Sequence, residues 1–129
     1  MEPIQQASHA ELEIMKIIWQ SDNKTTLGSL LKTPFAVNKK WKTNTVVTFL
    51  ARLVDKGLLT VVKEGRNNLY VAKITESEFR EQQTQTFIEK VFDGNAKELI
   101  SALFKQERLT ASEMKELTEF WQKGGESDE

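Results

Sequence analysis

Apolar residues recur at helical spacing in the first half of the chain. The first such segment places four of them on one helical face: Leu12, Met15, Ile18 and Trp19. Ser8 and Glu11 precede them with the spacing of a capping box, in which each side chain accepts a hydrogen bond from the other residue's backbone amide. We therefore predict a helix that starts at Ser8 and ends at residues 21–23.

A second, shorter helix is predicted over about residues 26–32. Its inward-facing residues are Leu27, Leu30 and Leu31. Pro34 ends this helix or lies just beyond its end, because the residue before a proline is pushed out of the helical region. The stretch from Phe35 to Lys40, which carries Lys39 as well, is interpreted as a loop.

A third helix is predicted from residue 42 or 43 to Lys56, with Gly57 just past its end. Its inward-facing residues are Val46, Phe49, Leu50 and Leu53. Two strands follow at residues 58–63 and 69–74, joined by a turn. Three helices and then a β-hairpin are the order of a winged helix-turn-helix domain, which we assign to residues 1–74 with a two-stranded wing.

The second half of the chain is predicted to be entirely helical. Capping boxes begin two of its helices, at Thr75 and at Thr110, and residues 93–95 break the chain between them. The predicted fold is therefore mainly α (α+β), with residues 75–123 forming a three-helix dimerisation domain and residues 124–129 a disordered tail. So short a set of helices buries little surface alone, and a second copy of the chain is the simplest partner. The predicted interface residues are Phe79, Phe87, Val91, Phe92, Leu99, Leu103, Phe104, Leu117, Phe120 and Trp121.

The residue content excludes several kinds of chemistry. The chain has no cysteine and its one histidine, His9, falls in the first turn of a predicted helix. Disulfides, thiolate nucleophiles and cysteine-based metal sites are excluded, and no set of side chains suits catalysis. We therefore expect no enzyme activity, no catalytic residue, no metal site and no cofactor.

The same content bears on location. No stretch approaches the roughly 20 apolar residues of a membrane span. Met1 is followed by Glu2 and Pro3 rather than by a basic segment and an apolar core, so no secretory signal is expected. We expect a cytoplasmic protein without a membrane partner.

Charge is divided unevenly along the chain. The net charge of −1 is the sum of +5 over residues 1–73 and −6 over residues 74–129. Residues 39–73, which include the third helix and the hairpin, carry +6. A basic front half favours contact with a polyanion, and double-stranded DNA is the expected partner.

Short polar side chains on the third helix suit the major groove of DNA. Asparagine can pair with adenine through two hydrogen bonds, threonine can offer a methyl group to thymine, and threonine, lysine and arginine can hold phosphates. The basic hairpin tip is expected to lie on the DNA backbone or to enter the minor groove. The predicted DNA-binding residues are Lys42, Thr43, Asn44, Thr45, Thr48, Arg52, Lys63, Arg66 and Asn67.

Two other functions are compatible with a winged helix. One is a protein–protein adaptor, which would present an apolar or acidic outer face, and the polar residues Lys42, Asn44 and Arg52 count against it. The other is a DNA-binding regulator controlled by a small-molecule ligand, which no feature of the sequence excludes.

Three segments of the chain resemble one known family. Residues 41–57, WKTNTVVTFLARLVDKG, resemble the W-x-x-x-T-V-x-T-x-L-x-R-L-x-x-K-G run of the BlaI/MecI/CopY family of penicillinase-type repressors. Residues 11–19 resemble the opening A-E-x-x-V-M-x-x-x-W helix of that family, and Gly65, Arg66 and Tyr70 resemble its G-R-x-x-x-Y wing.

The resemblance implies a homodimeric transcriptional repressor whose operator is an inverted repeat of the TACA/TGTA type. Thr45, Thr48 and Arg52 match the family run, whereas Thr43 and Asn44 fall at varied positions and are candidates for operator preference. A dimer would place two third helices in successive major grooves and block the polymerase.

Two departures from the family affect the inducing signal. Copper-responsive members carry a C-terminal Cys-x-Cys motif, which this cysteine-free chain lacks, so copper sensing by that route is excluded. Members that respond to β-lactams are cleaved, commonly after an asparagine that precedes an apolar residue, and Ala102-Leu103 occupies that place here. An inducing protease therefore stays open as a further partner.

Overall fold

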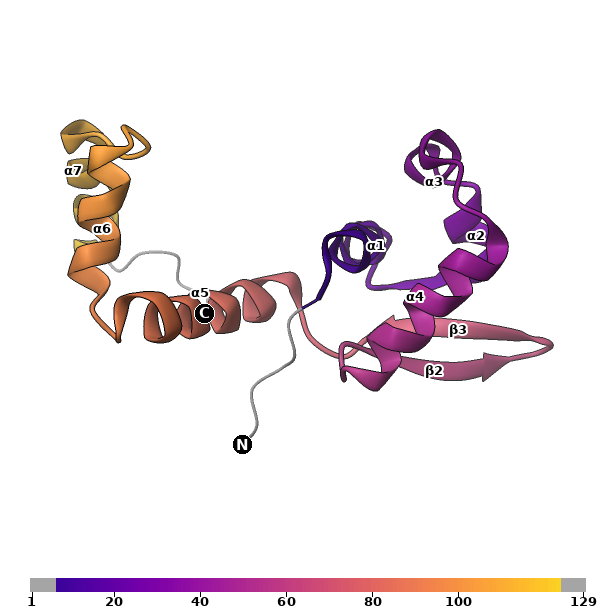
Figure 1. Ribbon diagram of the computed structural model, residues 1–129. Coiled ribbons are helices and arrows are strands. Elements are labelled where there is room, and N and C mark those ends of the chain that lie inside the picture. Colours follow the sequence, from indigo (N-terminus) through magenta and orange to yellow (C-terminus); the bar gives the residue numbers. More distant parts are fainter. Residues whose placement is uncertain (1–6, 124–129) are drawn as a thin grey trace. The chain divides into compact units, whose positions relative to one another are not determined.

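The chain divides into two compact units, Met1–Gln83 and Thr84–Glu129. The computed structural model describes residues 7–123, so the predicted tail at 124–129 lies outside the described residues (Figure 1). The division between the units falls inside a long helix, α5 (Glu76–Phe92), and not before it as the boundary at residue 74 predicts.

The first helix, α1 (His9–Gln20), begins with the predicted capping box. The Ser8 amide donates to Glu11 Oε1 at 3.0 Å, and the Glu11 amide donates to Ser8 Oγ at 3.2 Å. Ser8 is the N-cap and not the first helical residue. The apolar face of α1 is buried as predicted, except that Leu12 is only half-buried.

The segment between α1 and the third predicted helix differs from the prediction in two ways. A strand, β1 (Lys24–Thr26), precedes α2 (Leu27–Leu31), and the sequence analysis missed it. Residues predicted as a loop form a further helix, α3 (Pro34–Lys39). Pro34 starts α3 because a proline suits the first helical position, where its missing amide has no partner to lose.

The predicted third helix is α4 (Thr43–Asp55), and a left-handed glycine ends it. Gly57 has φ +82°, and its amide donates to the Val54 carbonyl at 3.0 Å. The Leu58 amide donates to the Leu53 carbonyl at 3.0 Å. These two bonds form the Schellman motif that the position of Gly57 predicts, and they turn the chain directly into the next strand.

The sheet has three antiparallel strands in the order β1-β3-β2 (Figure 1). Strands β2 (Leu59–Glu64) and β3 (Asn67–Ala72) form the predicted hairpin, with Glu64 opposite Asn67. The predicted two-stranded sheet is therefore extended by β1, which pairs with the other edge of β3. Gly65, with φ +64°, supplies the left-handed conformation that the two-residue turn needs.

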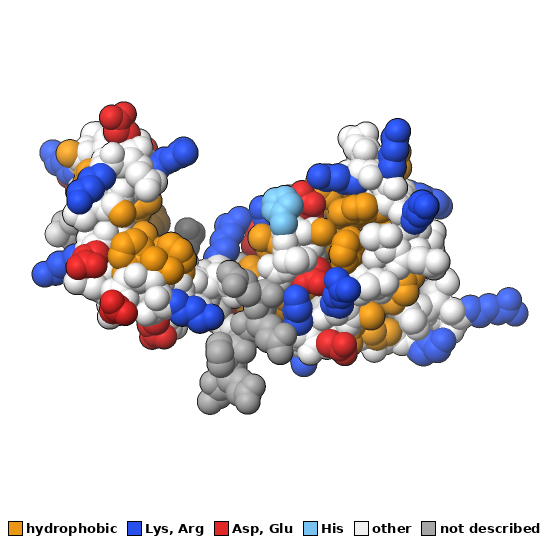
Figure 2. Space-filling view, viewed as in Figure 1, with side chains coloured by type: hydrophobic (Ala, Val, Ile, Leu, Met, Phe, Trp, Pro, Cys, Tyr) orange, Lys and Arg blue, Asp and Glu red, His pale blue; other side chains and the backbone are white. Residues whose placement is uncertain are grey.

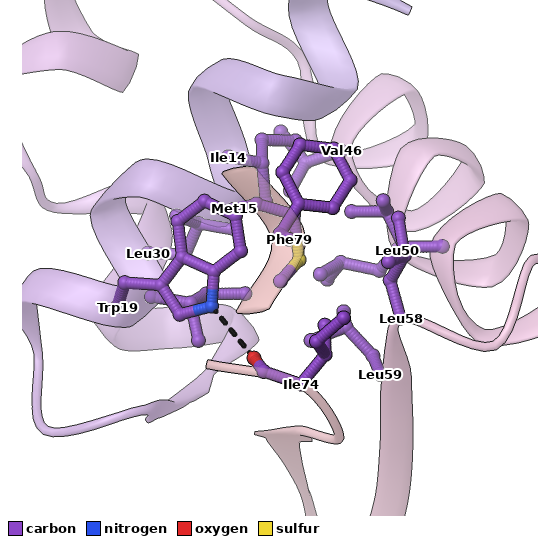
Figure 3. Close-up of a cluster of buried hydrophobic side chains, with 12 residues drawn as sticks. Ile14, Met15, Trp19, Leu30, Val46, Leu50, Leu58, Leu59, Ile74 and Phe79 are labelled. Atoms are coloured by element: carbon purple, nitrogen blue, oxygen red, sulfur yellow. Dashed lines mark hydrogen bonds between the residues drawn. The ribbon is translucent and has the colours of Figure 1, made fainter. Parts of the chain in front are cut away.

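A single apolar core joins α1, α2, α4 and the sheet (Figure 3). The Trp19 indole packs in this core, and its Nε1 donates to the Ile74 carbonyl at 3.0 Å. Phe79 lies in the same core, 6% exposed, with its ring centroid 5.5 Å from that of Trp19. Its prediction as a dimer-interface residue is therefore wrong, because the chain buries Phe79 within its own first unit.

The second unit contains the end of α5 and two more helices, α6 (Ala96–Lys105) and α7 (Ala111–Gln122). Thr110 and Glu113 form the predicted capping box of α7, and Thr75 and Glu78 form that of α5. None of the described residues 84–123 is buried. Figure 2 shows apolar side chains gathered on these helices. The exposed large apolar residues are Phe87, Val91, Phe104, Leu117, Phe120 and Trp121.

Two other features of the described chain concern processing and location. The peptide bond between Ala102 and Leu103 lies within α6, and both residues are half-buried. A protease that binds its substrate in an extended form would first have to unwind α6. Within residues 7–123, no helix combines the length and the apolar character that a membrane span requires.

Candidate nucleic-acid interface

Helix α4 presents one face to the core and a polar face to the outside. Val46, Leu50 and Leu53 are fully buried, so they fix how the helix rotates about its own axis. Of the predicted contact residues on this helix, Thr45 is half-buried. The others are exposed, as a polar DNA-reading face requires: Lys42, Thr43, Asn44, Thr48 and Arg52.

The N-terminus of α4 lacks a side-chain cap. Lys42 is the N-cap residue and makes no side-chain hydrogen bond to the first turn, whereas the N-caps of α1, α2, α3, α6 and α7 all accept one from a backbone amide. The first amides of α4 are thus left for an external acceptor. Together with the positive end of the helix dipole, they favour a phosphate at the place where the helix would enter a groove.

The wing and the start of α2 enclose an open cleft of about 340 Å³. Lys63, Arg66 and Asn67, all predicted as DNA-binding residues, line it. Asn68 and Tyr70, on the same strand as Asn67, also line it. Three further lining residues were not predicted, because they are far from the wing in sequence and meet it through the pairing of β1 with β3: Thr26, Leu27 and Gly28. Among residues 7–123 no carboxylate lines the cleft, so its two cations favour an anion.

A partly buried ion pair links the far end of α4 to α1. Lys56, the C-cap residue, places Nζ 2.5 Å from Oε1 of Glu11, which is 1% exposed. Burial opposes ionisation of the Glu11 carboxyl, but hydrogen bonds from Lys56 and Ser8 outweigh it and hold its pKa below the usual value. The sequence pattern indicates only the capping role of Glu11, because the partner in this second role lies 45 positions away.

Two apolar residues share the exposed face of α4. Val47, which is 40% exposed, and Ala51 lie at positions i+3 and i+7 from Asn44, on the same side of the helix. Neither residue was predicted to contact DNA. The helical spacing from Asn44 could have indicated them.

The helices that precede the hairpin, the cation-lined cleft at the wing and the polar face of α4 define a class of protein: the winged helix-turn-helix DNA-binding regulators. Comparison with known sequences narrows this class. The sequence model of a family described as penicillinase repressor matches residues 7–123. The chain therefore belongs to the penicillinase repressor family, and it is a DNA-binding transcriptional repressor.

Individual relatives are similar over nearly the whole chain. The penicillinase repressor of Bacillus licheniformis is 32% identical over 117 residues, which cover 91% of this chain and 90% of the relative. The methicillin resistance regulatory protein MecI of Staphylococcus aureus (strain N315) is 29% identical over 110 residues, covering 85% and 88%.

Two solved structures are similar over the winged helix. The solution structure of the DNA-binding domain of the repressor BlaI has a TM-score of 0.52 at 38% identity, covering 60% of this chain and 93% of that one. The monomeric form of Bacillus licheniformis BlaI in complex with the blaP half-operator has a TM-score of 0.50, with the same identity and coverage. The predicted family and winged-helix fold are thus confirmed.

Proposed function

We propose that this protein represses transcription as a homodimer that inserts two copies of α4 into successive major grooves of an inverted-repeat operator. The observation that carries the proposal is the exposed polar face of α4, with an uncapped N-terminus and a cation-lined cleft beside the wing. The bound dimer would exclude the polymerase from the promoter. Its role is regulatory, with no catalytic step.

Each part of the interface has a separate task in this proposal. Asn44, on the exposed face near the start of α4, pairs with an adenine. Arg52 and Lys42, near opposite ends of the helix, hold backbone phosphates and set the position of α4 in the groove. Lys63 and Arg66 draw a phosphate toward the cleft at the wing. The complex of BlaI with a half-operator supports DNA contact by the corresponding unit of this chain.

The second unit supplies the dimer interface. Large apolar side chains in residues 84–123 stay half-buried or exposed in the single chain, so that these helices have no interior of their own. Phe120 and Trp121, with ring centroids 5.5 Å apart, form an aromatic pair at the end of α7 that is suited to a partner surface. A second copy of the chain would contribute the same residues, so the interface would have two-fold symmetry.

Binding of the purified protein to its own upstream promoter DNA tests the proposal. Fluorescence anisotropy with promoter and scrambled duplexes, at several salt concentrations, should give salt-sensitive binding that prefers the promoter, with two chains per site. Equal affinity for the two duplexes at every salt concentration would contradict sequence-specific repression of this promoter. A stoichiometry of one chain per site would contradict the dimer.

A further inference from the structure

The exposed face of α4 is not uniformly polar. Its two ends carry the charged and amide side chains, Lys42 and Asn44 at the start and Arg52 in the last turn. Between them lie Val47, 40% exposed, and Ala51, also exposed. The middle of this face therefore presents methyl groups where the ends present hydrogen-bonding groups.

The remaining residue of this central part adds little donor capacity. The Thr48 hydroxyl donates to the Asn44 carbonyl at 2.9 Å, so its proton is already used within the helix. Val47 belongs neither to the core nor to the partly buried residues packed against it, whereas Val46 and Leu50 are fully buried in the core. An exposed β-branched residue also has a lower helix propensity than alanine, so Val47 does not stabilise α4.

Resting on the proposed DNA-binding function, we infer that Val47 determines specificity by contacting the 5-methyl group of a thymine in the major groove. Of the four bases, only thymine presents a methyl group there. Val47 lies one turn after Asn44, so a helix that places Asn44 at an adenine brings the isopropyl group of Val47 to a nearby base pair. The polar ends of α4 then fix its position while its centre distinguishes thymine from other bases.

The test removes each of the two methyl-bearing groups separately. The full-length protein first selects its preferred duplex from a pool with a randomised centre. Each thymine of the selected duplex is then replaced singly by deoxyuridine, which keeps the hydrogen-bonding groups and loses only the methyl. We expect one position in each half-site to lower affinity about fourfold, the equivalent of one buried methyl group.

The Val47→Ala variant completes a thermodynamic cycle. It should bind the thymine duplex about 16-fold more weakly than the wild type, because the dimer loses one such contact in each half-site, and it should show no further loss on replacement by deoxyuridine at that position. Val62→Ala is the matched control. Val62 is 47% exposed on β2, and strand alternation turns it away from the face of Lys63, so this variant should keep the full sensitivity to deoxyuridine.

The outcomes separate the inference from the function on which it rests. If no duplex is enriched from the pool, sequence-specific binding itself is refuted, and the inference falls with it. If a duplex is enriched but deoxyuridine changes nothing, or lowers the affinity of Val47→Ala as much as that of the wild type, the DNA-binding function stands and the role of Val47 is refuted.

Discussion

Replacing Lys56 by methionine leaves the buried Glu11 carboxylate without its cation. The Glu11 side chain is 2% exposed and the Lys56 side chain is 21% exposed. Removing one partner of a fully buried ion pair costs about 3–5 kcal/mol, whereas an exposed pair contributes about 0–1 kcal/mol. Because the pair lies between these two limits of exposure, we expect Lys56→Met to lower the free energy of unfolding by about 2–3 kcal/mol at neutral pH.

The pH dependence of this loss separates charge from packing. The pKa of Glu11 lies below its ordinary 4.5 in the folded protein, so the stabilisation by its ionised form is complete above that value and disappears as the pH falls through the lower, folded pKa. Without Lys56, the buried carboxyl binds a proton at milder acidity and no longer holds an unpaired charge. The difference between the two proteins should therefore shrink toward zero as the pH falls through the folded pKa of Glu11.

Urea unfolding followed by circular dichroism measures both effects. Lys16→Met, which removes an exposed lysine from α1, is the matched control and should stay within about 0.5 kcal/mol of the wild type. If Lys56→Met and Lys16→Met had the same urea midpoint at neutral pH, the stabilising role of the Lys56–Glu11 ion pair would be refuted. A loss that is equally large in acid would assign the effect to the methylene packing of Lys56 and not to its charge.

Four other substitutions test the remaining assignments. Phe79→Ala should destabilise the first unit by about 3–5 kcal/mol in urea unfolding and leave chain association unchanged in sedimentation, because Phe79 lies in the core beside Trp19. Trp121→Ser should weaken the dimer by about 30-fold in the same sedimentation assay without destabilising the first unit. Arg52→Ala should lower anisotropy-measured affinity for all duplexes and flatten the salt dependence, whereas Asn44→Ala should mainly reduce the preference for the operator. Unchanged affinity in both variants would contradict the choice of α4 as the recognition helix.

Local signals explain which parts of the fold the sequence predicts well. A capping box is a reciprocal pair of hydrogen bonds between residues three positions apart, so it depends only on local sequence. The starts of α1 and α7 could therefore be predicted from Ser8 with Glu11 and from Thr110 with Glu113. The face of α4 follows for the same reason, since Val46 and the residues one and two turns later are spaced for burial.

The parts that were missed depend on contacts between distant residues or on an ambiguous signal. Strand β1 has three residues and exists through its pairing with β3, with Thr25 opposite Tyr70. The start of α3 carried a signal, since Thr33 caps the Ala36 amide at 3.3 Å ahead of a proline, but that proline was interpreted only as the end of the previous helix. The spacing of apolar residues in α5 places Phe79 on an apolar face of the helix, but it does not indicate which unit buries this residue.

Helices α6 and α7 contain no buried residue, and this makes the concentration of active repressor depend on the total concentration of the chain. If the proposed dimerisation buries the apolar side chains of these helices, a single chain lacks part of its hydrophobic core. While most chains are single, the amount of paired protein follows the square of the total, so halving the total lowers it about fourfold. A promoter under such control would respond to gene dosage and to dilution during growth more steeply than in proportion to the amount of protein.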